Sequence, residues 1–256
     1  MSYFMLGHRL PRWLAKPLFG DRRRWGREAN RSDPMWVEWE RTYLDFYSAT
    51  QKGSIGDGIN HGGYAVLNGV DLRQKRVLEI GPGHIRHMAY WKGKPRDYVI
   101  CDIQQSMLTS SEAVLKEGGI PCTAVLLDRP DSALPFSDDE FDAVISFYSL
   151  EHIHPLRDYL LEIRRVLKPG GVLVGAIPSE GGLAWGTGRF LTSRRWLKKN
   201  TNIDPDKLIC WEHPNYAEDV LSQCDEIFIR ERIRYWPFRF LPLDLNLVVR
   251  FQYRNP

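Results

Sequence analysis

The stretch VLEIGPGHIRHMAYW, residues 77–91, joins a short apolar run to a glycine-rich turn. Such a turn after a buried strand is typical of dinucleotide-binding proteins, whose fingerprint needs three glycines at fixed spacing. Gly81 and Gly83 are present, but Arg86 stands at the third glycine position. Because the third glycine allows a helix to pack closely on the strand, its absence weakens the interpretation of a pyrophosphate-binding turn.

Strand-like and helix-like segments alternate on the carboxyl side of this turn. Residues 104–118 and 156–167 have helical character and separate most of the strand-like runs. Continuously apolar strands that alternate with helices predict a parallel sheet covered on both faces. The strand-like runs are residues 76–80, 98–102, 123–128, 141–147 and 172–178.

Two later runs, residues 226–236 and 245–253, alternate apolar and polar side chains. Pro237 and Pro242 lie in the link between them, which is too short for a helical crossover. The two runs are therefore predicted to form an antiparallel pair at one end of the sheet. A short helix is expected before them, near residues 215–223.

The chain divides by composition into two predicted parts. Residues 1–73 form a basic, aromatic arm and a helical cap, and residues 74–256 form the main domain with a cap insertion at about 179–213. Asp33-Pro34 starts a predicted helix over residues 34–51, in which aromatic positions recur every three or four residues. Residues 53–69 contain six glycines and are expected to form a loop or short capped helix near a ligand. The aromatic positions of the helix are Trp36, Trp39, Tyr43, Phe46 and Tyr47.

Residues 1–31 carry eight Lys or Arg side chains against two acids, although the net charge of the whole chain is only +3. Aromatic residues interleave with these cations, so the arm either lies on an anionic membrane surface or packs on its own domain. Pro11 and Pro17 interrupt any long amphipathic helix there. No base-reading motif accompanies the arm, so no specific nucleic acid partner is expected.

The composition places limits on the setting. With 256 residues and 43% hydrophobic content, the chain supports one sizeable core. Its four cysteines show no CxxC spacing, and no apolar run of membrane-spanning length or secretion signal is present. The expected location is the cytoplasm, at the inner membrane if the arm binds lipid. Pairing of two chains as a homodimer remains open.

Taken in order, the motifs resemble class I S-adenosylmethionine-dependent methyltransferases, in the group that acts on small molecules. The resemblance covers residues 74–178 and implies an α/β, Rossmann-like, doubly wound, mostly parallel seven-stranded sheet with an antiparallel terminal strand. It implies S-adenosyl-L-methionine as the cofactor. The N-terminal helical segment and the cap insertion lie outside it. The motifs that carry it are VLEIGPG (77–83), VICDI (99–103), ALPFSDDEFDAVIS (133–146), SLEHI (149–153) and EIRRVLKPGGVLV (162–174).

Asp102 is a candidate on its own chemistry, because a carboxylate at a strand end can accept from both hydroxyls of a ribose, or can cap the next helix. The resemblance assigns it the ribose, assigns Ile103 the adenine ring, and assigns Asp128 the adenine amino group. Asp131 is an alternative to Asp128. The remaining residues implied to contact the cofactor are Glu79, Gly81, Pro82, Gly83, Arg129 and Phe147.

Methyl transfer from a sulfonium is an in-line displacement, so the protein mainly aligns the acceptor and removes its proton. His152 is the candidate base, with Glu151 and His213 as further catalytic candidates, because histidine titrates near neutral pH. His154 lies close by in the sequence. The alternative is that these histidines orient a loop or cap a turn. Pairs such as His84 and His87 do not complete a ligand set of usual spacing, so no metal is predicted.

The acceptor pocket is expected between residues 34–51, 53–69 and 179–213. Rings in the insertion suit a sugar and its cations suit an anionic substrate, so a small-molecule or glycan acceptor is expected, which suggests a role in surface polysaccharide biosynthesis. The enzyme alternative is an NAD-dependent nucleotide-sugar oxidoreductase, but residues 148–185 lack a Tyr-x-x-x-Lys pair. The other alternative is a non-catalytic, cofactor-binding scaffold at a membrane surface. The candidate acceptor-pocket side chains are Trp185, Arg189, Phe190, Arg194, Arg195, Trp196 and Trp211.

Overall fold

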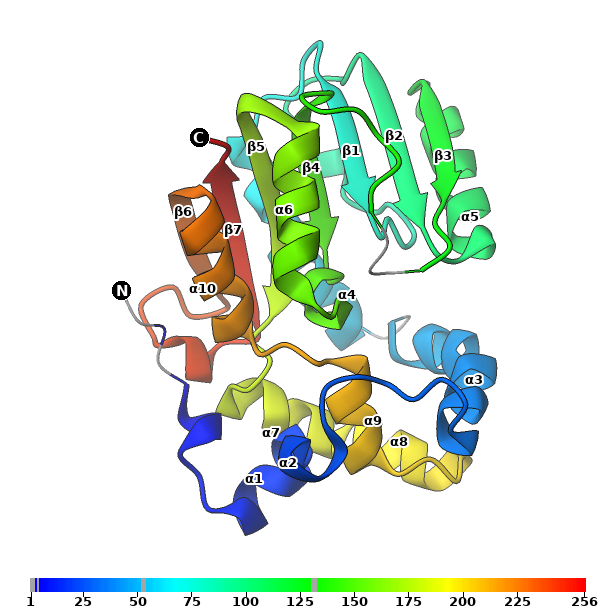
Figure 1. The fold of residues 1–256 in the computed structure, drawn as a ribbon, viewed down its shortest axis with the longest axis vertical. Helices are drawn as coiled ribbons and strands as arrows, with labels where there is room; N and C mark the ends of the chain where they lie inside the picture. The colour runs from blue at the N-terminus through cyan, green and yellow to red at the C-terminus, as the bar shows by residue number, and fades with distance from the viewer. Residues whose placement is uncertain (1–2, 4, 52–53, 130–132) are drawn as a thin grey trace.

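The computed structural model describes residues 3, 5–51, 54–129 and 133–256, and a seven-stranded sheet lies at its centre (Figure 1). The strand order is β3-β2-β1-β4-β5-β7-β6. Strands β1 to β5 are parallel, whereas β7 runs antiparallel to both β5 and β6. The predicted fold class is confirmed. The strands are β1 (Arg76–Ile80), β2 (Asp97–Asp102), β3 (Cys122–Leu126), β4 (Phe141–Phe147), β5 (Leu167–Pro178), β6 (Ile229–Trp236) and β7 (Val248–Arg254).

Successive side chains of a buried strand point to opposite faces of the sheet, so helices must pack on both faces to bury the apolar ones. In β1, Leu78 and Ile80 face one core, whereas Val77 faces the other. Helices α6 (Leu156–Val166) and α10 (Ala217–Ile227) cover the first face. Helices α4 (Ser54–Tyr64), η2 (Ala65–Gly69) and α5 (Gln105–Glu117) cover the second.

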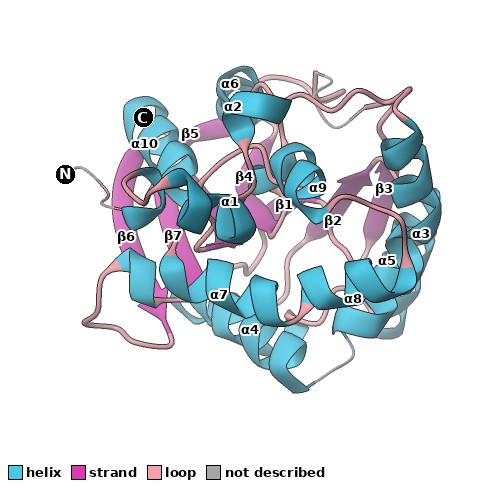
Figure 2. Cartoon of the chain, turned by 90° about the horizontal axis from the view of Figure 1, so that it is seen from below, coloured by secondary structure: helices cyan, strands magenta, loops and turns pink. Residues whose placement is uncertain are grey.

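The strand order reverses between β1 and β4, which are neighbours in the sheet although β2 and β3 lie between them in sequence. In open α/β sheets, ligands bind beyond the carboxyl ends of the strands at this switch point. In Figure 1, the cap helices lie beyond the end at which β1 and β4 finish, and Figure 2 shows them from that side, in front of the sheet. The switch point therefore opens toward the cap.

The cap is built from three parts of the chain. The insertion forms three short helices of eight or nine residues. Helices of this length are too short to show a clear hydrophobic period, which explains why no regular period is visible in the sequence. The predicted helix over residues 34–51 is present as α3. The cap helices are α1 (Arg12–Phe19), α2 (Arg22–Trp25), α3 (Pro34–Gln51), α7 (Leu183–Leu191), α8 (Ser193–Asn200) and α9 (Pro205–Glu212). Short 3-10 helices are η1 (Leu6–His8), η3 (Met88–Tyr90), η4 (Leu150–His152) and η5 (Leu243–Leu245).

The amino-terminal arm packs on the insertion. Phe19 is 1% exposed, and a β-carbon on Gly186 of α7 would lie 2.6 Å from its ring. The Arg22 guanidinium lies 3.7 Å from the centre of the Tyr216 ring and donates to the His213 carbonyl at 2.6 Å. These contacts agree with the expectation that the arm packs on its own chain. In the described part of the chain, no helix is long and apolar enough to cross a membrane.

Candidate functional site

The glycine-rich turn is locked against the segment that follows β4. Gly81 and Gly83 have φ of +65° and +57°, a region that glycine enters without steric cost. A β-carbon on Gly81 would lie 2.6 Å from the Ser149 hydroxyl oxygen, which donates to the Ile80 carbonyl at 3.0 Å. Pro82 lies between the two glycines. Since η4 begins at Leu150, directly after Ser149, His152 is held close to this turn.

Glu79 is fully buried behind the turn and accepts two hydrogen bonds. His87 Nε2 lies 2.8 Å from one carboxylate oxygen, and the Tyr98 hydroxyl donates to the other at 2.7 Å. Trp91 Nε1 donates to His87 Nδ1 at 2.9 Å, so the His87 proton is on Nε2 and points to Glu79. The network holds the end of β1 rigid. The predicted contact of Glu79 with the cofactor stays a prediction, because both its oxygens are engaged inside the protein.

Asp102 ends β2, and its ribose role stays a prediction. Its Oδ1 accepts from the Gln104 backbone N–H at 2.8 Å, which closes the turn before α5. Gln104 is the N-cap residue of α5, so Asp102 does not cap the helix itself. Burial raises the pKa of Asp102 above its ordinary value, against the backbone hydrogen bonds that lower it. The next side chain, Ile103, is 45% exposed. An exposed aliphatic side chain beside a carboxylate suits a ligand with an apolar ring and polar hydroxyls.

Asp128 lies on the loop that follows β3. The prediction that the third strand runs to residue 128 is wrong, because β3 ends at Leu126, whose side chain points to solvent at this edge of the sheet. The Leu127 N–H donates to the Asp102 carbonyl at 2.8 Å, which keeps the start of the loop beside β2. Asp128 and Arg129 are exposed. Asp131, the alternative, lies outside the described residues.

Phe147 ends β4 and belongs to a buried aromatic cluster rather than to an open wall. Its ring centre lies 5.0 Å from that of Tyr64 in an edge-to-face arrangement and 5.1 Å from that of His87. His87 is therefore a core residue that connects Glu79 to this cluster. Only 6% of Phe147 is exposed, so only a small part of its surface is available to contact a cofactor.

His152 and His213 come together beyond the carboxyl end of β4. Their ring centres are 4.6 Å apart at an interplanar angle of 68°. His152 Nδ1 lies 2.6 Å from the Glu212 carbonyl, which can only accept, so Nδ1 carries the proton and Nε2 is the basic atom. The side chain is 33% exposed, which allows a ligand to reach it. The structure thus brings two of the candidate catalytic side chains into contact, whereas their catalytic roles stay predictions.

Carboxylates surround the histidine pair and set its charge. Burial lowers the pKa of His152, but Glu151, Glu212 and Glu180 together outweigh burial and raise it above its ordinary value. Burial raises the pKa of Glu151 to about 7, and its Oε2 accepts no hydrogen bond from any described residue. For His213, burial and the neighbouring His152 lower the pKa. The two histidines thus have pKa values shifted in opposite directions.

A buried ion pair links this centre to the cap. Arg189 of α7 donates to both carboxylate oxygens of Glu180 at 2.6 Å, and His213 Nδ1 lies 3.0 Å from Oε2. Burial opposes ionisation of Glu180, yet Arg189 and His213 hold its pKa well below the usual range. Trp185 Nε1 also donates to Glu180 at 3.0 Å. Glu180 is therefore a charged anchor between β5 and α7.

Two further residues that the sequence prediction missed complete the centre. Trp39 Nε1 of α3 donates to a Glu212 side-chain oxygen at 2.7 Å, so the helical cap contacts the residue whose carbonyl binds His152. The buried Asn215 side chain donates to the Ile153 carbonyl at 2.6 Å and holds η4 to the chain after α9. No local sequence pattern marks either residue, because each donates a hydrogen bond to an oxygen of a segment that is distant in the sequence.

Most of the candidate acceptor-binding side chains are engaged within the cap. Arg189 pairs with Glu180, and Arg194 pairs with the buried Asp206. Trp211 donates to the Trp25 carbonyl, and Trp196 packs on Phe46. Arg195 and Phe190 remain exposed, as does His154. The Tyr47 side chain lies outside the described residues.

The two histidines considered for a metal site, His84 and His87, have different partners in the structure. His84 Nδ1 lies 3.2 Å from the Ser110 hydroxyl, whereas His87 is buried with Glu79. In the parts of the chain that the structure describes, no group of three or more His, Cys, Asp or Glu side chains is arranged to hold a metal ion.

The strand order, the glycine turn at the switch point and the acid at the end of β2 define the class of protein as an α/β protein of the methyltransferase type. Residues 78–175 match the family model described as a methyltransferase domain. Residues 78–175 therefore match a methyltransferase domain, in agreement with the resemblance that the sequence motifs carry.

Solved structures share this fold. An S-adenosylmethionine-dependent methyltransferase from Mesorhizobium loti superposes with a TM-score of 0.53 at 17% identity, over 80% of this chain and 99% of that one. The N-methyltransferase NodS from Bradyrhizobium japonicum WM9, solved with S-adenosyl-L-homocysteine, gives 0.55 at 15% identity, over 88% and 100%. At these identities, the likeness establishes the fold alone.

Similar sequences are named for quinone methylation. The ubiquinone/menaquinone biosynthesis C-methyltransferase UbiE of Pseudomonas fluorescens (strain Pf0-1) is 32% identical over 140 residues, which are 50% of this chain and 54% of that protein. The demethylmenaquinone methyltransferase of Corynebacterium efficiens is 40% identical over 78 residues, 30% of each chain. The chain thus spans about a third to a half of the length of these curated relatives.

Proposed function

We propose that the protein is an S-adenosylmethionine-dependent methyltransferase that methylates a hydroxyl-bearing small molecule, with His152 as the base. The observation that carries this proposal is the placement of His152. Its Nε2 is basic and reachable, and it follows within three residues of Ser149, which contacts the Gly81 turn. When bound, the cofactor supplies a methyl group already activated on a sulfonium.

The residues at the switch point fit this cofactor. Gly81 and Gly83 at positive φ bring bare backbone to the site, which suits the amino-acid portion, with Pro82 between them. The Asp102 carboxylate would accept from the ribose hydroxyls, and Ile103 would pack on the adenine. Glu79 would support the turn from behind. The roles of Asp128, Arg129 and Phe147 toward the adenine side remain part of the proposal.

The base step follows from the local contacts. His152 Nε2 takes the proton from the acceptor hydroxyl, so that the oxygen, or a ring carbon that the oxyanion activates, would form the new bond to the methyl carbon as the methyl–sulfur bond breaks. On carbon, the ring hydrogen would then leave as a proton and restore the hydroxyl. The Nδ1–H bond to the Glu212 carbonyl keeps the imidazole in the required tautomer. Glu151, whose Oε1 lies 3.8 Å from Nε2, stabilises the imidazolium that forms. His213 packs against the ring and is kept neutral by burial. The orientation of His152 thus depends on both η4 and α9.

The class of methyl acceptor can be inferred from which cationic side chains of the cap are free to bind a substrate. Arg189 and Arg194 are neutralised by buried carboxylates, so an anionic substrate would have to break an ion pair to use either of them. We therefore favour a neutral ring bearing a hydroxyl. The relatives are named for ubiquinone and menaquinone biosynthesis, and the reduced, dihydroxy form of a quinone is such a ring. A glycan acceptor in surface polysaccharide biosynthesis is the second candidate, supported only by the exposed Arg195 and Phe190.

The arm and the assembly of the protein remain proposals too. Trp13 of α1 is 74% exposed, which suits contact of residues 1–31 with a membrane surface, although Phe19 and Arg22 pack on the cap. We further propose that residues 1–73 form an arm with a helical cap and that residues 74–256 form a methyltransferase domain with a cap insertion. We also propose that two chains pair as a homodimer.

Calorimetric titration of the full chain with S-adenosylmethionine, S-adenosylhomocysteine and NAD, in parallel, tests the cofactor. We expect the first two to bind and NAD not to bind, because the turn lacks the third glycine of the dinucleotide fingerprint. Binding of NAD alone would establish the oxidoreductase alternative. Binding of none of the three would leave the scaffold alternative.

Asp102→Ala is expected to weaken S-adenosylhomocysteine binding by about 2–4 kcal/mol, as for the loss of a charge-assisted pair of hydrogen bonds. Asp158→Ala, at an exposed acid on α6, is the matched control and should bind normally. Because the pKa of Asp102 is raised, wild-type affinity should fall on acidification at a higher pH than an ordinary aspartate would cause. Calorimetry across pH measures both effects, and unchanged affinity in Asp102→Ala would remove its assigned role.

A further inference from the structure

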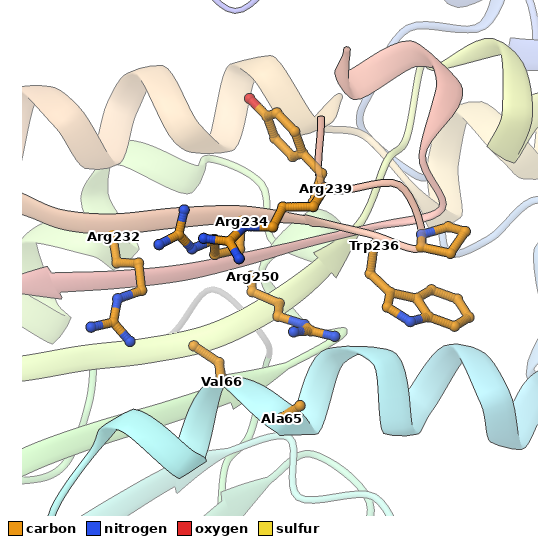
Figure 3. A pocket seen from close by; sticks show the side chains of 9 residues that line it. Ala65, Val66, Arg232, Arg234, Trp236, Arg239 and Arg250 are labelled. Atoms are coloured by element: carbon orange, nitrogen blue, oxygen red, sulfur yellow. The ribbon is translucent and has the colours of Figure 1, made fainter. Parts of the chain in front are cut away.

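A groove lined by four arginines lies on the sheet face covered by η2, outside the site described above (Figure 3). It encloses about 360 Å³ between Ala65 and Val66 of η2 and the ends of β6 and β7. Figure 3 shows Arg232, Arg234 and Arg250 along the two strands, with the Trp236 ring at one end. The lining residues are Ala65, Val66, Arg232, Arg234, Tyr235, Trp236, Pro237, Arg239 and Arg250.

Within the described part of the chain, the arginines of the groove lie without counter-charges. Arg234 and Arg250 are directly opposite in the antiparallel register, an arrangement that destabilises a sheet when both side chains carry like charge. Among the described residues, neither they nor Arg232 and Arg239 form an ion pair; Arg250 donates to the Gly62 carbonyl instead. A site that gathers cations at a cost to stability is suited to an anion.

Neighbouring polar groups do not relieve this charge. Glu231, the acid adjacent to Arg232, accepts from Gln252 at 2.7 Å and from Arg254 at 3.2 Å. Gln252, which lies opposite Arg232, has a buried Oε1 with no hydrogen-bond partner in the described chain. Burial lowers the pKa of Arg250, against the raising effect of Tyr148 and Tyr90. The groove therefore presents three or four cationic donors to a ligand.

The loop that continues from the groove is apolar and exposed. Phe240 is 93% exposed, Phe238 is 54% exposed and Leu241 is 41% exposed. Arg239, between the two phenylalanines, lies 5.9 Å from the Phe240 ring and lines the groove. Exposed aromatic side chains beside clustered cations are typical of surfaces that rest in the interface of an anionic bilayer. A phosphate in the groove and an apolar loop in the acyl boundary can be satisfied together by one lipid surface.

We propose that this groove binds the phosphate groups of anionic phospholipids while the loop at residues 237–241 enters the membrane interface. The contact is separate from any contact of the amino-terminal arm, because it uses β6, β7 and the loop between them. It places the protein peripherally on a lipid surface. The proposal does not depend on the identity of the methyl acceptor.

Co-sedimentation of the full chain with vesicles tests the proposal. Vesicles of phosphatidylcholine with phosphatidylglycerol should bind the protein more tightly than vesicles of phosphatidylcholine alone. The double variant Arg232→Gln/Arg234→Gln should bind the anionic vesicles roughly thirtyfold more weakly, since each basic residue near such a surface contributes about fivefold. Phe240→Ser should weaken binding as well. Arg195→Gln/Lys198→Gln, at exposed cations on α8, is the matched control and should retain binding.

Two results would overturn the proposal. The first is equal vesicle binding by the groove variant and the wild type. The second is binding of soluble pyrophosphate, measured calorimetrically, without any vesicle binding, which would assign the groove to a small anion. Loss of fold does not confuse the test, because removing like charges should leave the thermal midpoint of the double variant unchanged or raise it.

Discussion

Replacing His152 with asparagine should lower kcat about 10²- to 10⁴-fold while leaving the affinity for S-adenosylhomocysteine unchanged. This range is the usual contribution of a positioned general base. Asparagine can still donate toward the Glu212 carbonyl, so the local structure is retained while the basic atom is lost. Initial rates of methyl transfer, starting with a demethylated quinol as acceptor, measure the effect. His154→Asn, two positions away and exposed, is the matched control and should act as wild type.

The pH profile separates a base from a merely structural histidine. The wild-type rate should rise with pH as His152 loses its proton, with a midpoint above the ordinary value of about 6.5 because its pKa is raised. Glu151 is the foremost of the groups that raise it, so Glu151→Gln should move this limb to lower pH. A His152→Asn enzyme that keeps the wild-type rate and limb would show that another group is the base.

Glu180→Gln should lower the free energy of unfolding by about 3–5 kcal/mol, the range found when one partner of a buried ion pair is removed. The reason is the Arg189 side chain, 10% exposed, which would be left with its charge uncompensated. Glu226→Gln, in an ion pair with Arg157 whose side chains are more than half exposed, is the matched control and should cost about 0–1 kcal/mol. Urea denaturation at neutral pH measures both variants.

A double variant and the pH dependence check the cause. Glu180→Gln/Arg189→Met removes both charges and should recover much of the lost stability; equal instability would point to packing instead. Since the folded-state pKa of Glu180 is depressed, its contribution is present above the unfolded value, about 4.3, and is lost as pH falls through the lower folded value. Glu151 acts in the opposite sense: its ionisation costs stability as pH rises from the unfolded value to about 7.

The sheet could be predicted because its information is local. Each of β1, β2 and β4 is a short, mostly apolar run; the glycine turn follows the end of β1, and Asp102 is the last residue of β2. Glu180 lies two residues after the end of β5, so the same rule about strand ends could have predicted it as a site residue. It was missed because a single acid in a glycine-rich segment forms no recognisable motif. The error at Asp128 arose because an edge strand such as β3 ends without a change in its apolar character.

The rest of the site depends on contacts that no local pattern encodes. Trp39 has the spacing of a core residue of α3, and only the fold shows that it also binds Glu212. His87 has the spacing of a metal-pair histidine, yet Trp91 and Glu79 fix it in the core. In the same way, Arg189 and Arg194 are indistinguishable in sequence from ligand-binding cations, and their carboxylate partners appear only in three dimensions.

The packing of the arm on the cap has a consequence for the order in which the molecule assembles. Arg22 and His213 are 191 positions apart, and Trp39 and Glu212 are 173 apart. Contacts between such distant positions carry a large loop-closure cost and form slowly, whereas neighbouring strands of the sheet close shorter loops. We expect the sheet to form first and the cap to close over it last. The same weak, late unit should open first, which would separate the two histidines while the glycine turn, fixed in the sheet, stays intact.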